Sequence, residues 1–249
     1  MDLNEIKVIE DLSLNAWPSH QMQMYDGWIL RFSYYYTCRT NCVEEIGLSS
    51  LPIPEKVDYC ERIYHRWQTP CIFKSTPLTN PLLKEELESR GYGILRPTDV
   101  MVCNLEGITA HPENDLTIEN QVSYAWLQGL FDLNHTDNIV HRRIVPSMYA
   151  AIPKNQIAIS ITDHEKVIAT GLGILDRDYI GVYAIHVNPS YRRRHMARDI
   201  VSTLLVEGRK AGAKYAYLQC LSDNAPAKNL YQSLGFKTKY EYCFLAKEV

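Results

Sequence analysis

The two halves of this 249-residue chain repeat one order of elements, and this repeat limits the possible folds more than any other feature. Asn80 and Gly91 each stand 144 positions before their counterparts, Asn224 and Gly235. In each half a helix, a strand, an asparagine-led helix, a glycine-aromatic pair and a final strand follow without gaps. Two units of one fold, side by side, are therefore expected, although two ordinary α/β stretches can also match by chance.

The composition is that of a globular protein with a packed core. Hydrophobic residues make up 46% and charged residues 22%, which excludes disordered and fibrous classes. The formal net charge of -3 speaks against a nucleic-acid binder that relies on a basic surface. Apolar stretches are shorter than the roughly 20 residues that span a bilayer, and residues 1–11 lack the pattern of a signal peptide. We therefore expect neither nucleic acid nor a membrane as partner.

The cysteines are odd in number and form no CxxC pair: Cys38, Cys42, Cys60, Cys71, Cys103, Cys220 and Cys243. This pattern predicts reduced, buried thiols, because a disulfide framework or a zinc site needs regular spacing. The expected location is the cytoplasm, and no metal is expected.

A polar, turn-rich segment at 106–115 separates two series of helical and strand-like patterns. It is the expected linker between an N-terminal domain at 1–112 and a C-terminal domain at 113–249. Aromatic and β-branched residues at 22–40 predict paired strands. Other strands are predicted at 70–74, 99–105, 156–162, 166–175, 179–187, 214–220 and 238–246, and helices at 1–20, 54–67, 80–90, 119–134, 138–150, 195–211 and 225–234. This alternation predicts an α+β (α/β) protein with a mixed sheet.

The segment with the clearest chemistry begins where a predicted strand ends at Val187 and a helix starts after His195. A loop between a strand end and a helix start directs backbone N–H groups outward, and the helix dipole favours an anion there. Arg192, Arg193 and Arg194 add forked donors for phosphate oxygens. The loop is therefore a candidate site for a pyrophosphate, and a solvated helix start is the alternative.

The stretch VNPSYRRRHMARDIVSTLL resembles the acetyl-CoA-binding motif of the GNAT N-acetyltransferases, Q/R-x-x-G-x-G/A after a strand that ends in V-x-P. Arg192 fills the first position of the motif and Ala197 the last. His195 stands where the family commonly has glycine. A side chain there crowds the pyrophosphate, because glycine permits close approach of the backbone.

A second stretch, Asn224 to Phe236, matches the family pattern N-x-x-A-x-x-L-Y-x-x-x-G-F throughout. The resemblance implies that Asn224 binds near the pantetheine arm and that Tyr231 is the general acid for the departing thiolate. It covers residues 117–249 and implies tandem GNAT-like folds, each with a mixed, mostly antiparallel central sheet flanked by helices. The packing of the Tyr231 ring in a core is the alternative reading of that residue.

The resemblance implies an enzyme that moves an acetyl group from acetyl-CoA to a primary amine on a small molecule or peptide, as a monomer or homodimer. The residues expected to bind the donor are Ile185, His186, Val187, Arg192, Arg193, Arg194, His195, Met196, Ala197, Asn224 and Lys228. The general base is unassigned among Tyr183, His186 and Asp178. A CoA-binding module without catalysis, acting in sensing or assembly, is the second hypothesis.

The N-terminal half lacks the residues that carry this chemistry. Leu48 to Ile53, which fall opposite residues 192–197, hold neither arginine nor glycine, and Leu87 replaces the tyrosine. This half is expected to be structural or to shape the substrate site, without a cofactor of its own. The run Tyr34 to Tyr36 is expected at the sheet surface, between the units or in an acceptor pocket.

Overall fold

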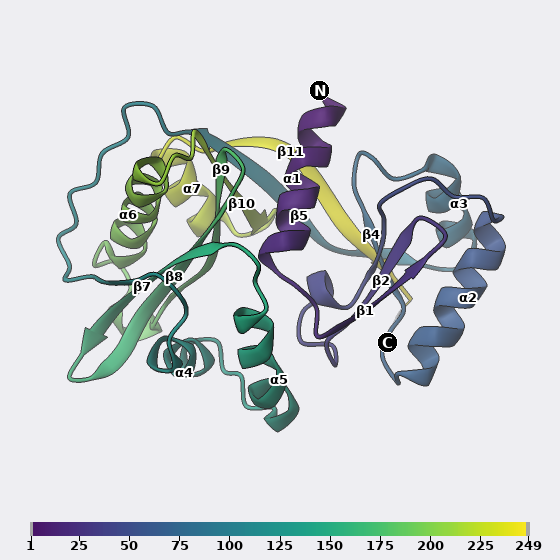
Figure 1. Ribbon diagram of the computed structural model, residues 1–249, viewed down its shortest axis with the longest axis horizontal. Coiled ribbons are helices and arrows are strands. Elements are labelled where there is room, and N and C mark those ends of the chain that lie inside the picture. The colour runs from purple at the N-terminus through teal and green to yellow at the C-terminus, as the bar shows by residue number, and fades with distance from the viewer. Residues whose placement is uncertain (1, 248–249) are drawn as a thin grey trace.

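The computed structural model describes residues 2–247, and its strands form a single sheet that runs through the whole molecule (Figure 1). The sheet has 11 strands in the order β1-β2-β3-β4-β11-β5-β10-β9-β8-β7-β6. Their bounds are β1 Gln21–Tyr25, β2 Trp28–Phe32, β3 Val43–Glu45, β4 Ile72–Ser75, β5 Gly93–Asn104, β6 Thr117–Glu119, β7 Asn155–Asp163, β8 Lys166–Asp176, β9 Tyr179–Val187, β10 Tyr215–Leu221 and β11 Lys237–Ala246. Only the pairs β3–β4 and β9–β10 are parallel.

Helices cover both faces of this sheet: α1 Leu3–Ala16, α2 Ile53–Arg66, α3 Pro81–Ser89, α4 Tyr124–Leu133, α5 Ile139–Ala150, α6 Met196–Lys210 and α7 Ala225–Ser233. In Figure 1, α2 and α3 flank one end of the molecule, α6 and α7 flank the other, and α1 crosses the middle. Strand β8 separates two cores, because Leu172 and Ile174 pack with α4 and α5. Gly171 faces α6, where a Cβ would lie 2.2 Å from Ile200, so glycine lets the helix approach closely.

The repeat predicted from the sequence is confirmed in the structure. Helices α3 and α7 are each nine residues long, and the side chains of Asn80 and Asn224 cap them by accepting backbone N–H bonds. Such a cap contributes about 1 kcal/mol to helix stability. Gly91 and Gly235 follow the two helices with φ of +82° and +91°, the left-handed conformation that ends a helix.

The two halves exchange their final strands. Strand β5 lies between β11 and β10, with Ala216 opposite Cys103, whereas β11 lies between β4 and β5, with Leu245 opposite Phe73. Each of the equivalent strands β4 and β10 is therefore completed by the last strand of the other half. Met101 of β5 accordingly packs in the core under α6.

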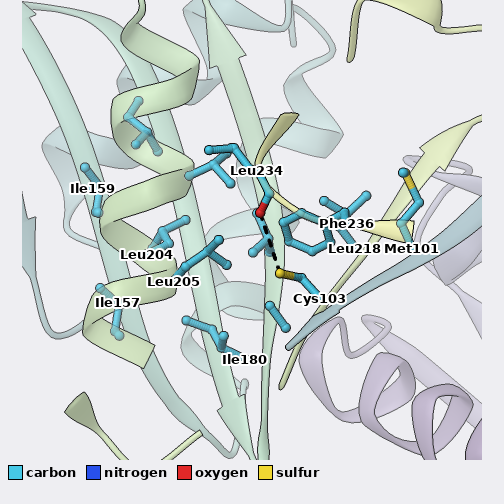
Figure 2. Packing of buried hydrophobic residues seen from close by; sticks show 14 of the residues in the cluster. Met101, Cys103, Ile157, Ile159, Ile180, Leu204, Leu205, Leu218, Leu234 and Phe236 are labelled. Atoms are coloured by element: carbon cyan, nitrogen blue, oxygen red, sulfur yellow. Dashed lines mark hydrogen bonds between the residues drawn. The ribbon is translucent and has the colours of Figure 1, made fainter. Parts of the chain in front are cut away.

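The core of the C-terminal half lies between α6, α7 and the sheet (Figure 2). Leu204 and Leu205 of α6 meet Ile157 and Ile159 of β7, and the Cys103 thiol donates to the Leu234 carbonyl at 3.6 Å. Burying one such aliphatic side chain contributes about 1.5–3 kcal/mol, so this cluster holds α6 firmly on the sheet.

The prediction of strands throughout 22–40 was wrong beyond Phe32. Residues 33–42 form a compact loop with one short 3-10 turn at Cys38–Thr40. The side-chain carbonyl of Asn41 accepts the backbone N–H groups of Ser33 at 2.7 Å and Tyr35 at 2.8 Å, which closes the loop. The short strands β3 and β6 were not predicted, because three residues give too little alternation.

No helix among residues 2–247 is long and apolar enough to cross a membrane. In the same residues, no cluster of three or more histidine, cysteine or acidic side chains is arranged to hold a metal ion. All seven cysteines are free thiols.

Candidate functional site

The sheet opens between β9 and β10, and this opening is the centre of the candidate site. The parallel ladder ends at the pair Val182 and Leu218, although β9 continues to Val187. A bulge lies just beyond, where Ala184 has a φ of +50° and the register with β8 shifts. Among the described residues the β10-facing edge of 183–187 therefore has no strand partner, and it can hydrogen-bond a ligand.

Alternating residues of β9 face opposite sides of this opening. Ile185 and Val187 pack against the core under α6, and Ala184 packs on the side of α4 and α5. His186 lies on the same side as Ala184, where it lines a hollow. One strand thus presents backbone to the opening, aliphatic groups to the α6 face and an imidazole to the other face.

The loop predicted to cradle a pyrophosphate follows directly. Asn188 accepts the backbone N–H of Ser190 at 3.0 Å and closes a short 3-10 turn. Arg193 and His195 have φ of +63° and +59°, so both occupy the left-handed region. For a residue with a side chain this conformation costs roughly 1–2 kcal/mol, which explains why glycine suits position 195. Helix α6 begins at Met196, and the backbone N–H groups of residues 196–198 have no hydrogen-bond acceptor among residues 2–247.

The loop arginines are exposed and have no carboxylate partner within residues 2–247. Arg194 lies over the ring of Tyr191, 5.1 Å from its centroid, and Tyr191 donates to Asp163 at 2.5 Å. Arg192 and Arg193 make no ion pair with any described residue, so their forked donors remain available to an anionic ligand. His195 and Ala197 adjoin them, exposed and half-buried respectively.

The sequence did not identify Asp199 as part of this site. Its buried carboxylate accepts the backbone N–H groups of Glu113 and Asn114 at 3.0 and 3.1 Å, and the Asn114 amide at 2.7 Å. Asn114 also donates to the carbonyl of Arg194 at 3.1 Å. The linker, which passes around the outside of α6 in Figure 1, is thus tied to the arginine loop. An acidic residue in the first turn of α6 was the available signal.

Helix α7 brings the second motif to the same opening. Asn224 is exposed and caps its own helix through Ala227. Lys228 forms an ion pair with the buried Asp99 of β5 at 2.5 Å, so its charge is already matched by the exchanged strand. The ring of Tyr231 packs against the core under α6 and lies 6.0 Å from that of Phe236.

The Tyr231 hydroxyl makes no hydrogen bond with residues 2–247, and burial raises the pKa of this phenol above its ordinary value of 10. The phenol therefore stays protonated at neutral pH and can donate its proton.

Two adjoining hollows of about 310 and 140 Å³ lie on the face opposite α6. They share the side chains of Tyr36, Thr37 and Arg39, which belong to the 33–42 loop of the N-terminal half. The remaining walls of the larger hollow are Tyr35, Cys38, Arg96, Thr98, Gln219, Leu221, Tyr242 and Phe244. The smaller hollow is completed by Ala16, Trp17, Leu130, Asn134, Tyr149, Leu172, Tyr183, Ala184 and His186. The 33–42 loop thus lines the space beside the open strands.

The three candidate bases fall in different surroundings. Asp178 lies at the far end of β9, exposed and paired with Lys214 at 2.8 Å. Tyr183 shares a hydrogen bond of 2.6 Å with the hydroxyl of Tyr217, and burial raises its pKa to about 12. Burial lowers the pKa of His186 below its ordinary 6.5, so this imidazole is neutral at pH 7. His186 is thus unprotonated, as a base must be, and it lines the smaller hollow, whereas Asp178 lies outside both hollows and Tyr183 keeps its proton at pH 7.

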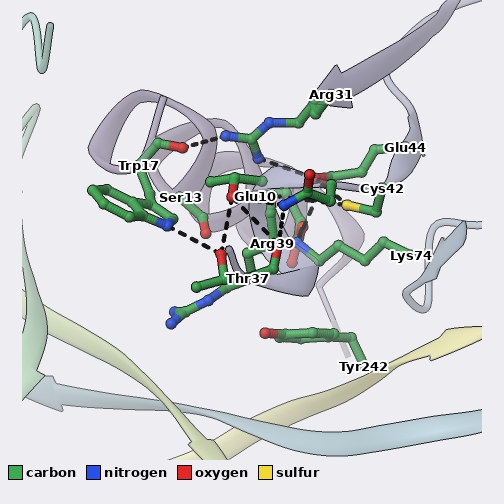
Figure 3. A network of polar contacts seen from close by, with 12 residues as sticks. Glu10, Ser13, Trp17, Arg31, Thr37, Arg39, Cys42, Glu44, Lys74 and Tyr242 are labelled. Atoms are coloured by element: carbon green, nitrogen blue, oxygen red, sulfur yellow. Dashed lines mark hydrogen bonds and ion pairs between the residues drawn. The ribbon is translucent and has the colours of Figure 1, made fainter. Parts of the chain in front are cut away.

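A buried ion network lies behind the larger hollow (Figure 3). Lys74 contacts Glu10 and lies 3.4 Å from Glu44, which also pairs with Arg31 at 3.3 Å. Burial lowers the pKa of Lys74, but the two carboxylates outweigh burial and raise it above the ordinary value. The two negative charges of the glutamates and the two positive charges of Lys74 and Arg31 therefore balance. Figure 3 shows the guanidinium of Arg39 turned away from this network.

The N-terminal counterpart of the arginine loop already holds an anion of the chain itself. The Asp26 carboxylate accepts the backbone N–H groups of Leu51 at 2.9 Å and Ser50 at 3.0 Å, and these bonds lower its pKa to about 2. Buried Lys56 lies 3.4 Å from the same carboxylate. Leu87, opposite Tyr231 in the repeat, is fully buried in the core.

Comparison with known proteins gives consistent results. Residues 3–245 match the model of a family described as "Probable histone acetyltransferase Rv0428c C-terminal". The uncharacterized N-acetyltransferase YobR of Bacillus subtilis is 21% identical, over 98% of this chain and 100% of that protein. Among solved structures, a GCN5-related N-acetyltransferase from Kribbella flavida has a TM-score of 0.71 at 13% identity, covering 98% of this chain and 95% of that one. A tandem GNAT protein from the clavulanic acid biosynthesis pathway has a TM-score of 0.63 at 11% identity, with 83% and 75% covered.

Proposed function

Because this chain belongs to the Rv0428c C-terminal acetyltransferase family, within the GNAT superfamily of N-acetyltransferases, we propose that it transfers an acetyl group from acetyl-CoA to a primary amine. The observation that carries the proposal is the open strand pair β9 and β10 beside a loop of unpaired arginines. Arg192 and Arg193 would hold the pyrophosphate together with the first N–H groups of α6. The free edge of 185–187 would bind the pantetheine amides and the acyl carbonyl.

The acyl donor supplies a thioester, whose carbonyl carbon is open to attack by a neutral amine and whose sulfur leaves as a thiolate. His186 faces the hollow on the acceptor side and is neutral at pH 7, so we assign it the removal of the amine proton, directly or through water. Tyr231 lies on the α6 side and remains protonated, so it is suited to donate a proton to the thiolate.

One donor site per chain is proposed, in the unit at 113–249. The loop before α2 uses its N–H groups on Asp26, and a buried leucine replaces the tyrosine there. The unit at 1–112 contributes the loop 33–42 to the acceptor side instead. The free cysteines favour a reducing compartment, so we place the protein in the cytoplasm.

Calorimetric titration of acetyl-CoA tests the donor site. We expect one site per chain with a Kd on the order of micromolar. The double variant Arg192→Gln/Arg193→Gln should weaken binding by at least about 10-fold, because each charge-assisted bond contributes roughly 1.5–3 kcal/mol. Arg209→Gln, an exposed change at the other end of α6, is the matched control and should bind normally.

Two sites per chain would contradict the single-donor assignment. No binding would mean that His195 closes the cradle and would overturn the donor proposal. If acetyl-CoA binds but no amine causes release of the CoA thiol, the catalytic part of the proposal is wrong. The protein would then be a CoA-binding module.

The pH dependence of kcat/KM tests His186. Both the amine and His186 must be deprotonated, so log kcat/KM should rise with a slope of 2 below the His186 pKa and a slope of 1 between that pKa and the pKa of the amine. The change of slope is expected below pH 6.5, because burial lowers this pKa. His186→Gln should lower kcat by about 10²-fold and leave a slope of 1 at every pH below the pKa of the amine. A change of slope that survives in His186→Gln would assign the base to another group.

A further inference from the structure

The hollow on the acceptor side has positively charged walls and no acidic ones. Arg39 and Arg96 line it, and none of the residues that line the two hollows is an aspartate or glutamate. The nearby histidine adds no charge at pH 7, because its pKa is lowered. A cationic amine such as a diamine would find nothing here to balance a second positive charge.

Arg39 is half-buried yet has no carboxylate partner among residues 2–247. Its guanidinium donates one hydrogen bond, to the amide oxygen of Gln219 at 3.1 Å. That oxygen also accepts from the Tyr242 hydroxyl at 2.9 Å, which holds the amide in place. A guanidinium has five N–H donors, so four remain for a ligand. The acids behind the hollow are matched by Lys74 and Arg31 and do not compensate Arg39.

Arg96 reaches the same hollow from the exchanged strand. The register between β5 and β11 shifts between the pairs Thr98–Tyr242 and Leu95–Phe244, so Arg96 lies in a β-bulge. Its φ is +51°, and the Thr98 hydroxyl donates to its carbonyl at 2.9 Å. A bulge of this kind redirects a side chain. Two independent elements, the 33–42 loop and the bulged strand, thus place unpaired guanidinium groups in one hollow.

We propose that the acceptor is a small amine that carries a carboxylate, such as an amino acid or short peptide, and that Arg39 and Arg96 bind this carboxylate. The inference rests on the proposed function and adds the class of acceptor. Planar guanidinium groups suit carboxylates in two-point geometry. The larger hollow, about 310 Å³, has the size of a small-ligand site, and Tyr36, Tyr242 and Phe244 provide apolar walls. His186 lines the adjoining hollow with Arg39, so the amine would lie there while the acid group stays at the arginines.

A panel of matched acceptors tests the inference, with thiol release at saturating acetyl-CoA as the measure. The panel pairs free amino acids with their carboxamides and O-phosphoethanolamine with ethanolamine, and includes putrescine. Free amino acids should exceed their carboxamides in kcat/KM by at least about 10-fold, the loss expected when one charge-assisted bond is missing. If only the phosphorylated amine is preferred, the acceptor carries an anionic group, but the proposal that this group is a carboxylate is wrong.

Variants then assign the effect to the two arginines. Arg39→Gln and Arg96→Gln should each raise KM for the preferred amino acid about 10-fold, with kcat and the activity on its carboxamide little changed. Arg39→Lys should recover part of the loss, because it keeps the charge without the fork. Arg62→Gln, an exposed change on α2, is the control. Thermal unfolding and acetyl-CoA binding should be normal in all of them, which excludes misfolding.

The failure of the inference can be told from that of the proposed function. Equal use of amino acids, carboxamides and putrescine, or equal losses on charged and neutral acceptors in Arg39→Gln, would overturn the acceptor class alone. Absence of acetyl-CoA binding would overturn the proposed function, whereas calorimetric titration of the amino acids into the free protein still reports on the hollow. A panel with neither turnover nor binding would overturn the inference.

Discussion

Replacement of Tyr231 by phenylalanine should lower kcat about 10³-fold and leave the Kd for acetyl-CoA within about twofold. The substitution keeps the ring that packs against the core under α6 and removes only the hydroxyl. Because that hydroxyl makes no hydrogen bond with residues 2–247, thermal stability should not fall. Stopped-flow detection of thiol release, combined with calorimetry, separates the loss of proton donation from a loss of binding.

Tyr124→Phe is the matched control, because Tyr124 is 78% exposed at the start of α4, outside the hollows and the arginine loop. Its kcat should be normal. If Tyr231→Phe also kept its kcat, the tyrosine would be a packing residue and water or another group would protonate the thiolate.

Replacement of Lys74 by methionine should destabilise the protein by about 3–5 kcal/mol, the usual result of removing one partner from a buried ion pair. Glu44 would then keep Arg31 as a partner, and Glu10 would have no cationic partner within the described residues. The network joins α1, β2, β3 and β4, so its loss loosens several elements. Denaturant unfolding measures the change in the free energy of unfolding.

Lys7→Met provides the control for burial, since Lys7 pairs with Asp11 on the exposed side of α1 at 3.3 Å. Its effect should stay below about 0.5 kcal/mol, as for other exposed pairs on helices. Adding Glu10→Gln to Lys74→Met should recover part of the loss, because it removes the carboxylate that has lost its cation and keeps the pair of Arg31 and Glu44. Equal effects of Lys74→Met and Lys7→Met would show that the network is open to water.

Local signals predicted most helix ends to within one or two residues, but the predicted helix at 1–20 ends at Ala16 and the one at 119–134 begins only at Tyr124. Asn80 and Asn224 cap their helices through neighbouring backbone groups, so a few adjacent residues determine the outcome. The prediction of a strand after Phe32 was wrong, because aromatic residues favour strands unless another contact intervenes. Here Asn41 bonds the backbone of Ser33 and Tyr35 and bends the chain, which no period of apolar residues reveals.

The parts of the site that depend on distant partners were not predictable. Alternation in β11 indicates a strand but not its neighbours, so the exchange with β5 stayed hidden. The arginine loop is a local motif, and the sequence singled it out. Whether Arg39 has a carboxylate partner depends instead on Lys74 and Arg31, because these two residues pair with the buried carboxylates. Its unmatched charge appears only once those distant groups are in place.

The strand exchange described for β5 and β11 has a consequence for how the chain is made. During synthesis, β4 and β5 emerge long before residues 237–246, which must lie between them. Until those residues leave the ribosome, two strand edges in the first half of the chain lack their partner. Completion of the sheet is therefore a late event, and these edges stay open to pairing with other chains while translation continues.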